Sequence, residues 1–173
     1  MGGPVRRIDV EIASHPEGGL RLRYFLDCDV SRILVPAAAP SERTDGLWEH
    51  TCFEAFIGGK GSNAYCEFNF SPSTQWAAYG FLSYRGGMVP LEYSTAPTVA
   101  ASVTDDRIAL EALIPLEALL ALPGEDTLLL SLAAVIEESD GRLSYWALAH
   151  RAEIPDFHSP AGFVLEIDRA NTW

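Results

Sequence analysis

Two glutamates, Glu54 and Glu67, are the side chains whose types and spacing most directly suggest chemistry. Each stands in a segment where polar and apolar residues alternate, which is typical of a β-strand with unlike surroundings on its two faces. If the segments pair apolar face to apolar face across the glycine-rich turn 58–63, Glu54 lies beside Glu67 and Asn69. Like charges opposed on a sheet repel, so we expect a proton, a cation or a ligand donor between the two carboxyl groups.

Two indole rings accompany these acids. Trp48 and His50 share the predicted strand face of Glu54, and the simplest register of the next strand places Trp76 on the face of Glu67. Ala78 and Gly80 would then form a low floor. Aromatic walls beside carboxylate and amide groups suit a small polar ring such as a sugar, which predicts a ligand-binding site. Tryptophans in a β-sandwich are also common core residues, so burial decides between the two interpretations.

The same two carboxyl groups fit a second hypothesis, a glycoside hydrolase. That reaction needs two carboxyl groups about 5 to 10 Å apart, one with a raised pKa, and residues opposed on neighbouring strands approach this spacing. No catalytic motif accompanies Glu54 and Glu67 in the sequence. The pattern therefore favours binding over catalysis.

A second group of polar residues lies towards the end of the chain. A predicted strand carries Trp146 and His150 on one face, and a proline-bounded loop then presents Asp156 and His158. Loops of this kind often carry functional groups. His150, Asp156 and His158 have the atoms to bind a metal, but their spacing matches no metal-site signature, and structural histidines held by hydrogen bonds are the default interpretation.

The elements that must position these residues are predicted to be short strands. Alternating or continuous apolar patterns indicate strands at 8–12, 20–24, 48–57, 64–71, 75–84, 99–103, 108–114, 128–136, 143–149 and 163–167. Segment 128–136 is apolar on both faces, which predicts a central strand. One short helix is expected after Pro115, ending before Pro123. Without long amphipathic crossovers, this pattern predicts an all-β, antiparallel β-sandwich with one short helix.

Composition limits the class of partner. The 173 residues are 48% hydrophobic and 21% charged, which predicts a single folded domain over residues 1–173. Acids outnumber bases 24 to 12, and the net charge of −12 disfavours nucleic acid and anionic membranes. Neutral small molecules, sugars and cations remain as ligands. The oligomeric state is left open.

The expected compartment is the cytoplasm. No secretory signal pattern is found at the start of the sequence, and no apolar stretch approaches the ~20 residues of a membrane span. Three cysteines, an odd number without Cys-x-x-Cys spacing, make a disulfide framework or a cysteine zinc site unexpected.

The sequence resembles bacterial DOMON-like domain proteins over residues 46–163. The motifs that carry the resemblance are 48–56 (WEHTCFEAF), 65–73 (YCEFNFSPS), 76–79 (WAAY), 114–116 (IPL), 146–150 (WALAH) and 155–158 (PDFH). The wider superfamily includes family 9 carbohydrate-binding modules and haem-binding domains. The resemblance implies an immunoglobulin-like β-sandwich that binds a sugar or b-type haem, without catalysis.

Two departures from the superfamily pattern bear on the ligand. Family 9 modules are secreted, which makes extracellular polysaccharide a poor match for a chain expected in the cytoplasm. Haem relatives pair an axial methionine with histidine or lysine, whereas this chain offers Met88 in a glycine-rich loop with His50, His150 or His158 as partner. Haem b therefore stands as an alternative ligand. A calcium ion at Glu54 and Glu67 is a corollary of the saccharide hypothesis, and the sequence indicates neither haem nor calcium.

Overall fold

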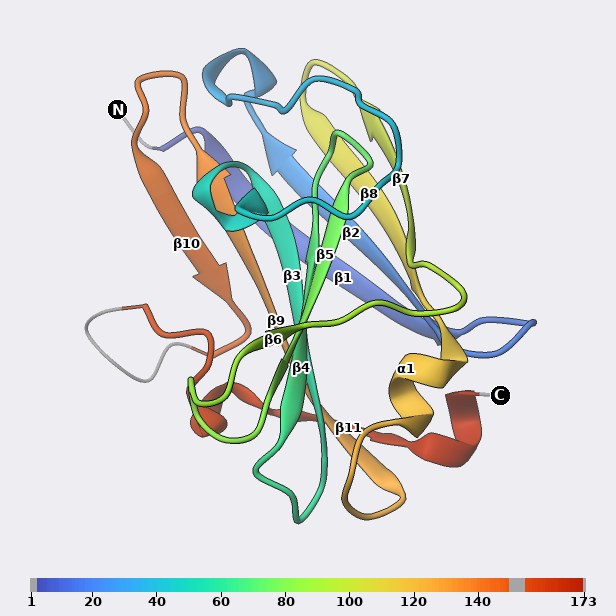
Figure 1. The fold of residues 1–173 in the computed structure, drawn as a ribbon. Coiled ribbons are helices and arrows are strands. Elements are labelled where there is room, and N and C mark those ends of the chain that lie inside the picture. The colour runs from blue at the N-terminus through green and yellow to red at the C-terminus, as the bar shows by residue number, and fades with distance from the viewer. Residues whose placement is uncertain (1–2, 150–154, 173) are drawn as a thin grey trace.

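Two antiparallel sheets form the protein, packed face to face in a sandwich (Figure 1). A computed structural model describes residues 3–149 and 155–172, and the statements below concern these residues. The four-stranded sheet contains, in spatial order, β1 (Val5–Ser14), β2 (Leu20–Cys28), β8 (Arg107–Ile114) and β7 (Thr98–Val103). The second sheet contains β10 (Leu143–Ala147), β9 (Thr127–Glu137), β3 (Cys52–Gly59), β4 (Tyr65–Phe70), β5 (Trp76–Phe81) and β6 (Val89–Pro90), with β11 (Leu165–Asp168) also paired to β9. The predicted all-β sandwich is confirmed.

Helical segments are short. The α-helix α1 (Leu116–Leu120) begins directly after Pro115, as predicted. Single 3-10 turns are η1 (Val30–Arg32), η2 (Leu47–Glu49), η3 (Pro160–Gly162) and η4 (Arg169–Thr172). Within the described ranges, no helix has the length and apolar character needed to cross a membrane.

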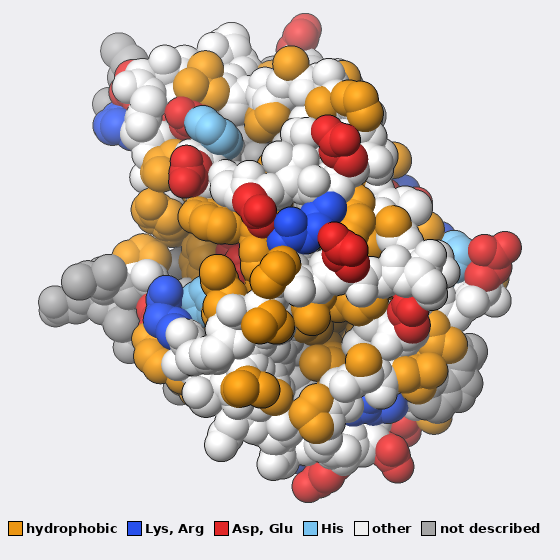
Figure 2. Space-filling view, in the orientation of Figure 1, with side chains coloured by type: hydrophobic (Ala, Val, Ile, Leu, Met, Phe, Trp, Pro, Cys, Tyr) orange, Lys and Arg blue, Asp and Glu red, His pale blue; other side chains and the backbone are white. Residues whose placement is uncertain are grey.

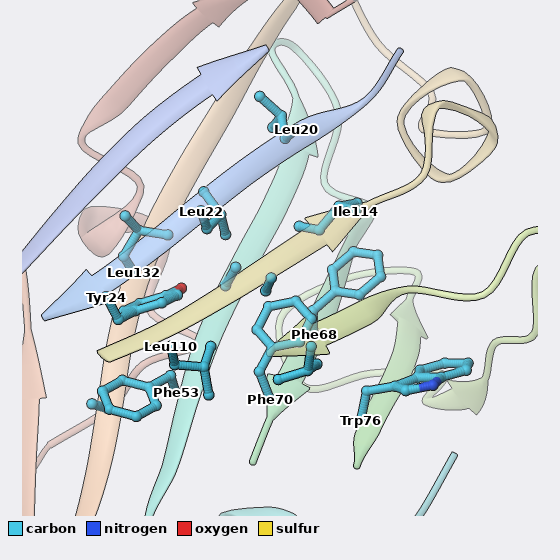
Figure 3. Packing of buried hydrophobic residues seen from close by; sticks show 14 of the residues in the cluster. Leu20, Leu22, Tyr24, Phe53, Phe68, Phe70, Trp76, Leu110, Ile114 and Leu132 are labelled. Carbon is cyan, nitrogen blue, oxygen red and sulfur yellow. The ribbon is translucent and has the colours of Figure 1, made fainter. Parts of the chain in front are cut away.

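The main hydrophobic core lies between the sheets. Alternate residues of β2 and β8 point inward from the small sheet, including Leu22 and Leu110. They meet the inward residues of β3 and β4, among them Phe53, Phe68 and Phe70 (Figure 3). Strict alternation on each strand produces this layer because successive side chains point to opposite faces.

A second apolar cluster covers the outer face of the seven-stranded sheet. Phe56, Tyr79 and Phe81 are buried there, and Phe157 and Phe163 from the C-terminal segment pack against them. Strands β3, β4 and β9 are therefore covered on both faces, which explains the almost uninterrupted burial of β9 that its apolar sequence predicts. The outer cluster is where the candidate site lies.

The register of β3 against β4 agrees with the sequence prediction. Glu54 lies opposite Asn69, and Phe56 lies opposite Glu67. Both glutamates point to the outer face because Ala55, between Glu54 and Phe56, belongs to the inter-sheet core.

The predicted register of β5 is wrong by one residue. Glu67 lies opposite Tyr79, and Trp76 lies opposite Phe70. Trp76 is consequently 6% exposed in the inter-sheet core beside Phe70 (Figure 3). The slip arises in the turn before β5, where Thr74 adopts a left-handed backbone with φ of 79°. This conformation is usual for glycine, so the sequence carried no signal for the extra residue.

The three cysteines are buried free thiols. Cys28 and Cys66 belong to the inter-sheet core, whereas Cys52 belongs to the outer cluster. Burial raises the pKa of each thiol, to about 12 for Cys66.

Candidate functional site

A cavity of about 420 Å³ opens on the outer face of the seven-stranded sheet. On this side of the molecule, Figure 2 shows a hollow with apolar sides and an acidic side chain recessed within it. Its aromatic lining consists of Trp48, Phe56, Tyr79, Phe81, Tyr145 and Phe157, and its charged or ionisable lining of Glu54, Glu67, Arg85 and His158. Met88, Val135 and Pro155 complete it. The volume suits a ligand of one or two rings.

The two glutamates occupy the floor of the cavity. Glu54 is 3% exposed and Glu67 is 7% exposed, so both carboxyl groups are almost withdrawn from solvent. Asn69 donates a hydrogen bond from Nδ2 to Oε1 of Glu67 at 2.9 Å. The Oδ1 atom of Asn69 is buried and has no hydrogen-bond partner among the described residues.

Burial shifts the ionisation of both acids in the same direction. Loss of solvent raises the pKa of Glu54 well above its usual value, and the nearby Glu67 raises it further. Burial also raises the pKa of Glu67, opposed by the Asn69 hydrogen bond and the positive charge of Arg85. The cavity floor therefore holds protons more strongly than ordinary carboxyl groups would.

His158 closes one side of the floor. Its Nδ1 lies 2.8 Å from Oη of Tyr65, and Nε2 lies 3.5 Å from Oε2 of Glu67. The backbone N–H of Arg85 donates to the same Tyr65 oxygen. Both ring nitrogens of His158 therefore have polar neighbours, Nδ1 the Tyr65 hydroxyl and Nε2 the Glu67 carboxyl group. Burial, followed by the charge of Arg85, lowers the pKa of His158 to about 4. The ring is neutral at physiological pH.

An ion pair at the rim joins two loops. The Asp156 carboxylate accepts a hydrogen bond from Arg85 Nη2 at 2.8 Å and another from the Tyr84 hydroxyl. These bonds lower the pKa of Asp156 despite its partial burial. The Asp156 carboxylate also accepts a bond from the backbone N–H of His158, so the ion pair fixes the loop that carries the imidazole.

The aromatic walls come from separate parts of the chain. Trp48, in the turn η2, meets Tyr79 edge to face with ring centroids 5.7 Å apart, and the Tyr79 hydroxyl donates to Asp45. On the other side, Phe157 lies 6.1 Å from Tyr145 and 6.5 Å from Phe56 between ring centroids. The cavity thus lies between two groups of rings.

The structure brings together part of the sequence-predicted set. Trp48, Glu54, Glu67 and His158 line the cavity, Asn69 bonds to Glu67 from beside it, and Asp156 holds the rim. Trp48 reaches the cavity from a 3-10 turn and not from the strand that its sequence pattern predicted.

Other predicted residues lie elsewhere. Trp76 is in the inter-sheet core, and Trp146 also packs against that core, with its indole N–H donating to Ser144. His50 is exposed and bonds through Nδ1 to Glu137 at 2.7 Å. His150 lies outside the described residues. The expectation that Trp76, Ala78 and Gly80 flank the acids is therefore wrong.

Several lining residues were not predicted as site residues. Tyr79 and Phe81 were missed because the register slip assigned them to the wrong face of β5. Tyr145 precedes Trp146 on β10 and points to the opposite face of the sheet. Placing Trp146 in the core from the sequence would therefore have predicted that Tyr145 points to the cavity side. Arg85 lies in a loop, where no periodic pattern marks which side chains point inward, and Met88 in the same loop was named only as an axial ligand of the haem alternative.

A solved structure resembles this architecture. A proposed carbohydrate-binding protein from Bacteroides uniformis aligns with a TM-score of 0.69, covering 91% of this chain and 76% of its own, at 18% sequence identity. The two chains share a fold. No protein-family model matches the sequence, and no curated protein matches it. At this identity the likeness establishes the architecture and leaves the ligand to the cavity itself.

The described residues do not fit b-type haem. Met88 and His158 both line the cavity, but axial ligation needs an imidazole nitrogen with an available lone pair. Nδ1 of His158 is hydrogen-bonded to the Tyr65 hydroxyl, and Nε2 lies 3.5 Å from a carboxyl oxygen of Glu67, so both ring nitrogens already have polar neighbours. The Phe56 and Phe81 rings also lie 5.0 Å from the imidazole, between ring centroids. The expected pairing of Met88 with His50 fails as well, because His50 does not line the cavity.

Calcium at the two glutamates finds no support in the arrangement. Calcium prefers six to eight oxygen ligands at short range. In the described part of the chain, no group of three or more histidine, cysteine, aspartate or glutamate side chains is arranged around a common point. One oxygen of Glu67 already accepts a hydrogen bond from the amide of Asn69, so fewer oxygen atoms remain to coordinate calcium.

Proposed function

We propose that this protein is a non-catalytic domain that binds a small saccharide or a similar polar ring compound in the outer-face cavity. The observation that carries the proposal is the aromatic-walled cavity with carboxyl groups at its floor. Flat rings supply contact area for a ligand ring, and buried polar groups fix its orientation through hydrogen bonds. The resemblance to DOMON-like proteins and the fold shared with a proposed carbohydrate-binding protein both support a sugar ligand.

Trp48 is the side chain whose removal tests the proposal most directly. It lines the cavity yet is 39% exposed, so its indole is available to a ligand and contributes little to the core. Isothermal titration calorimetry against a panel of mono- and disaccharides and cyclic polyols should detect a ligand. We expect Trp48→Ala to weaken that binding by about tenfold or more through loss of ring contact.

A matched control keeps the result specific. Phe25 is a half-buried aromatic residue on the outer face of the other sheet, where Arg23 and Arg107 lie over its ring. Phe25→Ala should leave the affinity unchanged. If no compound of the panel binds, or if Trp48→Ala binds as tightly as the wild type, the proposed site is wrong.

Hydrolysis is the competing use of the two glutamates. Burial raises the pKa of both carboxyl groups, whereas glycoside hydrolysis needs one of them ionised as nucleophile or base. We therefore expect wild type and Glu54→Gln to release chromophore from aryl glycosides at the same background rate. Release by the wild type that Glu54→Gln abolishes would replace the binding proposal with an enzymatic one.

A further inference from the structure

The floor of the cavity holds more hydrogen-bond acceptors than donors. Glu54 and Glu67 present carboxyl oxygens to it. Beside the cavity, and not in its lining, the buried Oδ1 of Asn69 has no partner among the described residues. A buried acceptor without a donor costs stability, so such a cluster is suited to a ligand that supplies N–H or O–H groups.

The cations and donors already present do not balance these acceptors. The guanidinium group of Arg85 bonds to Asp156. Nε2 of the neutral His158 lies 3.5 Å from Oε2 of Glu67, which is a long contact for a hydrogen bond. Besides the Asn69 amide, which donates to one oxygen of Glu67, the two buried carboxyl groups thus have only one engaged cation and one distant ring nitrogen nearby among the described residues.

The rings around these acceptors favour positive charge. An aromatic face carries a negative quadrupole that attracts a cation within about 6 Å of the ring centre. Six aromatic side chains line the cavity, and the indole of Trp48 belongs to the ring type that attracts cations most strongly. Aromatic walls and buried acids together form a cage in which an ammonium group interacts favourably with each part.

We infer that the cavity selects a ring compound bearing a protonated amino group, of which an amino sugar is the simplest example. This inference rests on the proposed function and specifies its ligand class. The ammonium group would lie at Glu54 and Glu67 and donate to their oxygens, while the ring of the ligand packs against the aromatic walls. A neutral sugar would meet the same walls but would bind the two acids through hydrogen bonds alone, without the added attraction between opposite charges.

Charge linkage gives this inference a second readout. A cation at the floor stabilises the ionised form of Glu54 and Glu67, so protons held there by burial are released when the ligand binds. The ionisable groups that face these carboxyls, or lie close to them or to those that do, are Tyr24 on β2, Cys52 on β3, Tyr65 and Cys66 on β4, Tyr79 on β5, Asp45 before η2, Arg85 after β5, and Asp156 and His158 after β10. The charge of Glu67 contributes to the raised pKa of Cys52, Tyr65 and Tyr79, but these groups keep their protons at neutral pH with or without the ligand. The released protons therefore come mainly from the two glutamates.

The test compares ligands that differ only in charge. Calorimetry would measure the affinities of glucosamine against glucose, galactosamine against galactose, and aminocyclohexanol against cyclohexanediol, with N-acetylglucosamine as an uncharged analogue of similar shape. We expect the amine of at least one pair to bind about tenfold or more tightly than its hydroxyl partner. Repeating the titration in buffers of different ionisation enthalpy should reveal proton release for the amine alone.

Variants assign the preference to the two acids. Glu54→Gln and Glu67→Gln should each reduce the ratio of amine to hydroxyl affinity, whereas Glu166→Gln, at an exposed ion pair with Lys60, should not. Equal affinities within every pair, or a preference unchanged in both cavity variants, would overturn the inference and leave the proposed function standing. Absence of binding by every amine and hydroxyl compound would overturn both.

Discussion

Glu54 is a buried carboxylic acid whose pKa is affected by the charge of a second acid, Glu67. Its pKa in the folded protein is raised above its usual 4.5, which approximates the value in the unfolded chain. At pH values between the unfolded pKa and the folded pKa, the folded protein keeps a proton on Glu54 that the unfolded chain has lost. Stability is therefore greatest below the unfolded pKa and decreases as pH rises toward the folded one.

Glu54→Gln should remove this loss of stability. The amide has nearly the shape of the acid and does not ionise, so we expect the variant to gain stability over wild type by on the order of 1 kcal/mol at about pH 8, and by less at about pH 5. Thermal unfolding at both pH values measures the difference. Substitution of the exposed Glu166 by Gln is the control. If the stability gained by Glu54→Gln does not increase with pH, Glu54 does not have a raised pKa in the folded protein.

His158 contributes to pH dependence with the opposite sign. Its pKa is lowered from 6.5 to about 4. Between these two pH values the unfolded chain is protonated at His158 and the folded protein is not. Stability from this group falls as pH decreases through that window. Wild type and Glu54→Gln share His158, so its contribution cancels when the two proteins are compared.

The strand β5 decides which tryptophan is structural. Its register turns Trp76 into the inter-sheet core, while Trp48 stands on a short turn at the cavity edge. Removing a buried indole leaves a void that the surrounding residues fill only in part. We expect Trp76→Ala to cost about 3 to 5 kcal/mol in urea unfolding and Trp48→Ala about 1 kcal/mol or less. Similar costs for the two variants would mean that the register is not as described.

Strand positions were predictable because burial on one face imposes alternation. The opening hairpin, the doubly buried strand β9, the helix after Pro115 and the outward direction of both glutamates all follow from that pattern. It does not determine turn geometry. Thr74 takes a left-handed conformation without a glycine to signal it, and one extra residue reverses every side chain of β5.

The remaining site residues depend on long-range folding. Arg85 and Asp156 are 71 positions apart and meet only because two loops converge above the outer face. Tyr65 and His158 are 93 positions apart. No local pattern encodes such meetings, so the sequence predicted Asp156 and His158 as candidates without predicting what they contact.

On the scale of the whole molecule, one sheet separates two apolar regions with different roles. The inter-sheet core joins both sheets, and the outer cluster is covered by loops and surrounds the cavity. The floor residues stand on β3 and β4, which are packed on both faces and flanked by strands on both edges. The glutamates are consequently held on rigid strands, while the rim groups come from loops.

The buried thiols allow the opening of the two apolar regions to be measured separately. Cys66 can meet an alkylating reagent only if the sheets part, whereas Cys52 needs only the covering of the outer face to lift. We expect native-state labelling, followed by mass spectrometry, to modify Cys52 faster than Cys66. A compound bound in the cavity should slow the labelling of Cys52. The labelling rate of Cys66, divided by the rate of global unfolding, should stay the same. Equal rates at both thiols would show instead that the two apolar regions open as one unit.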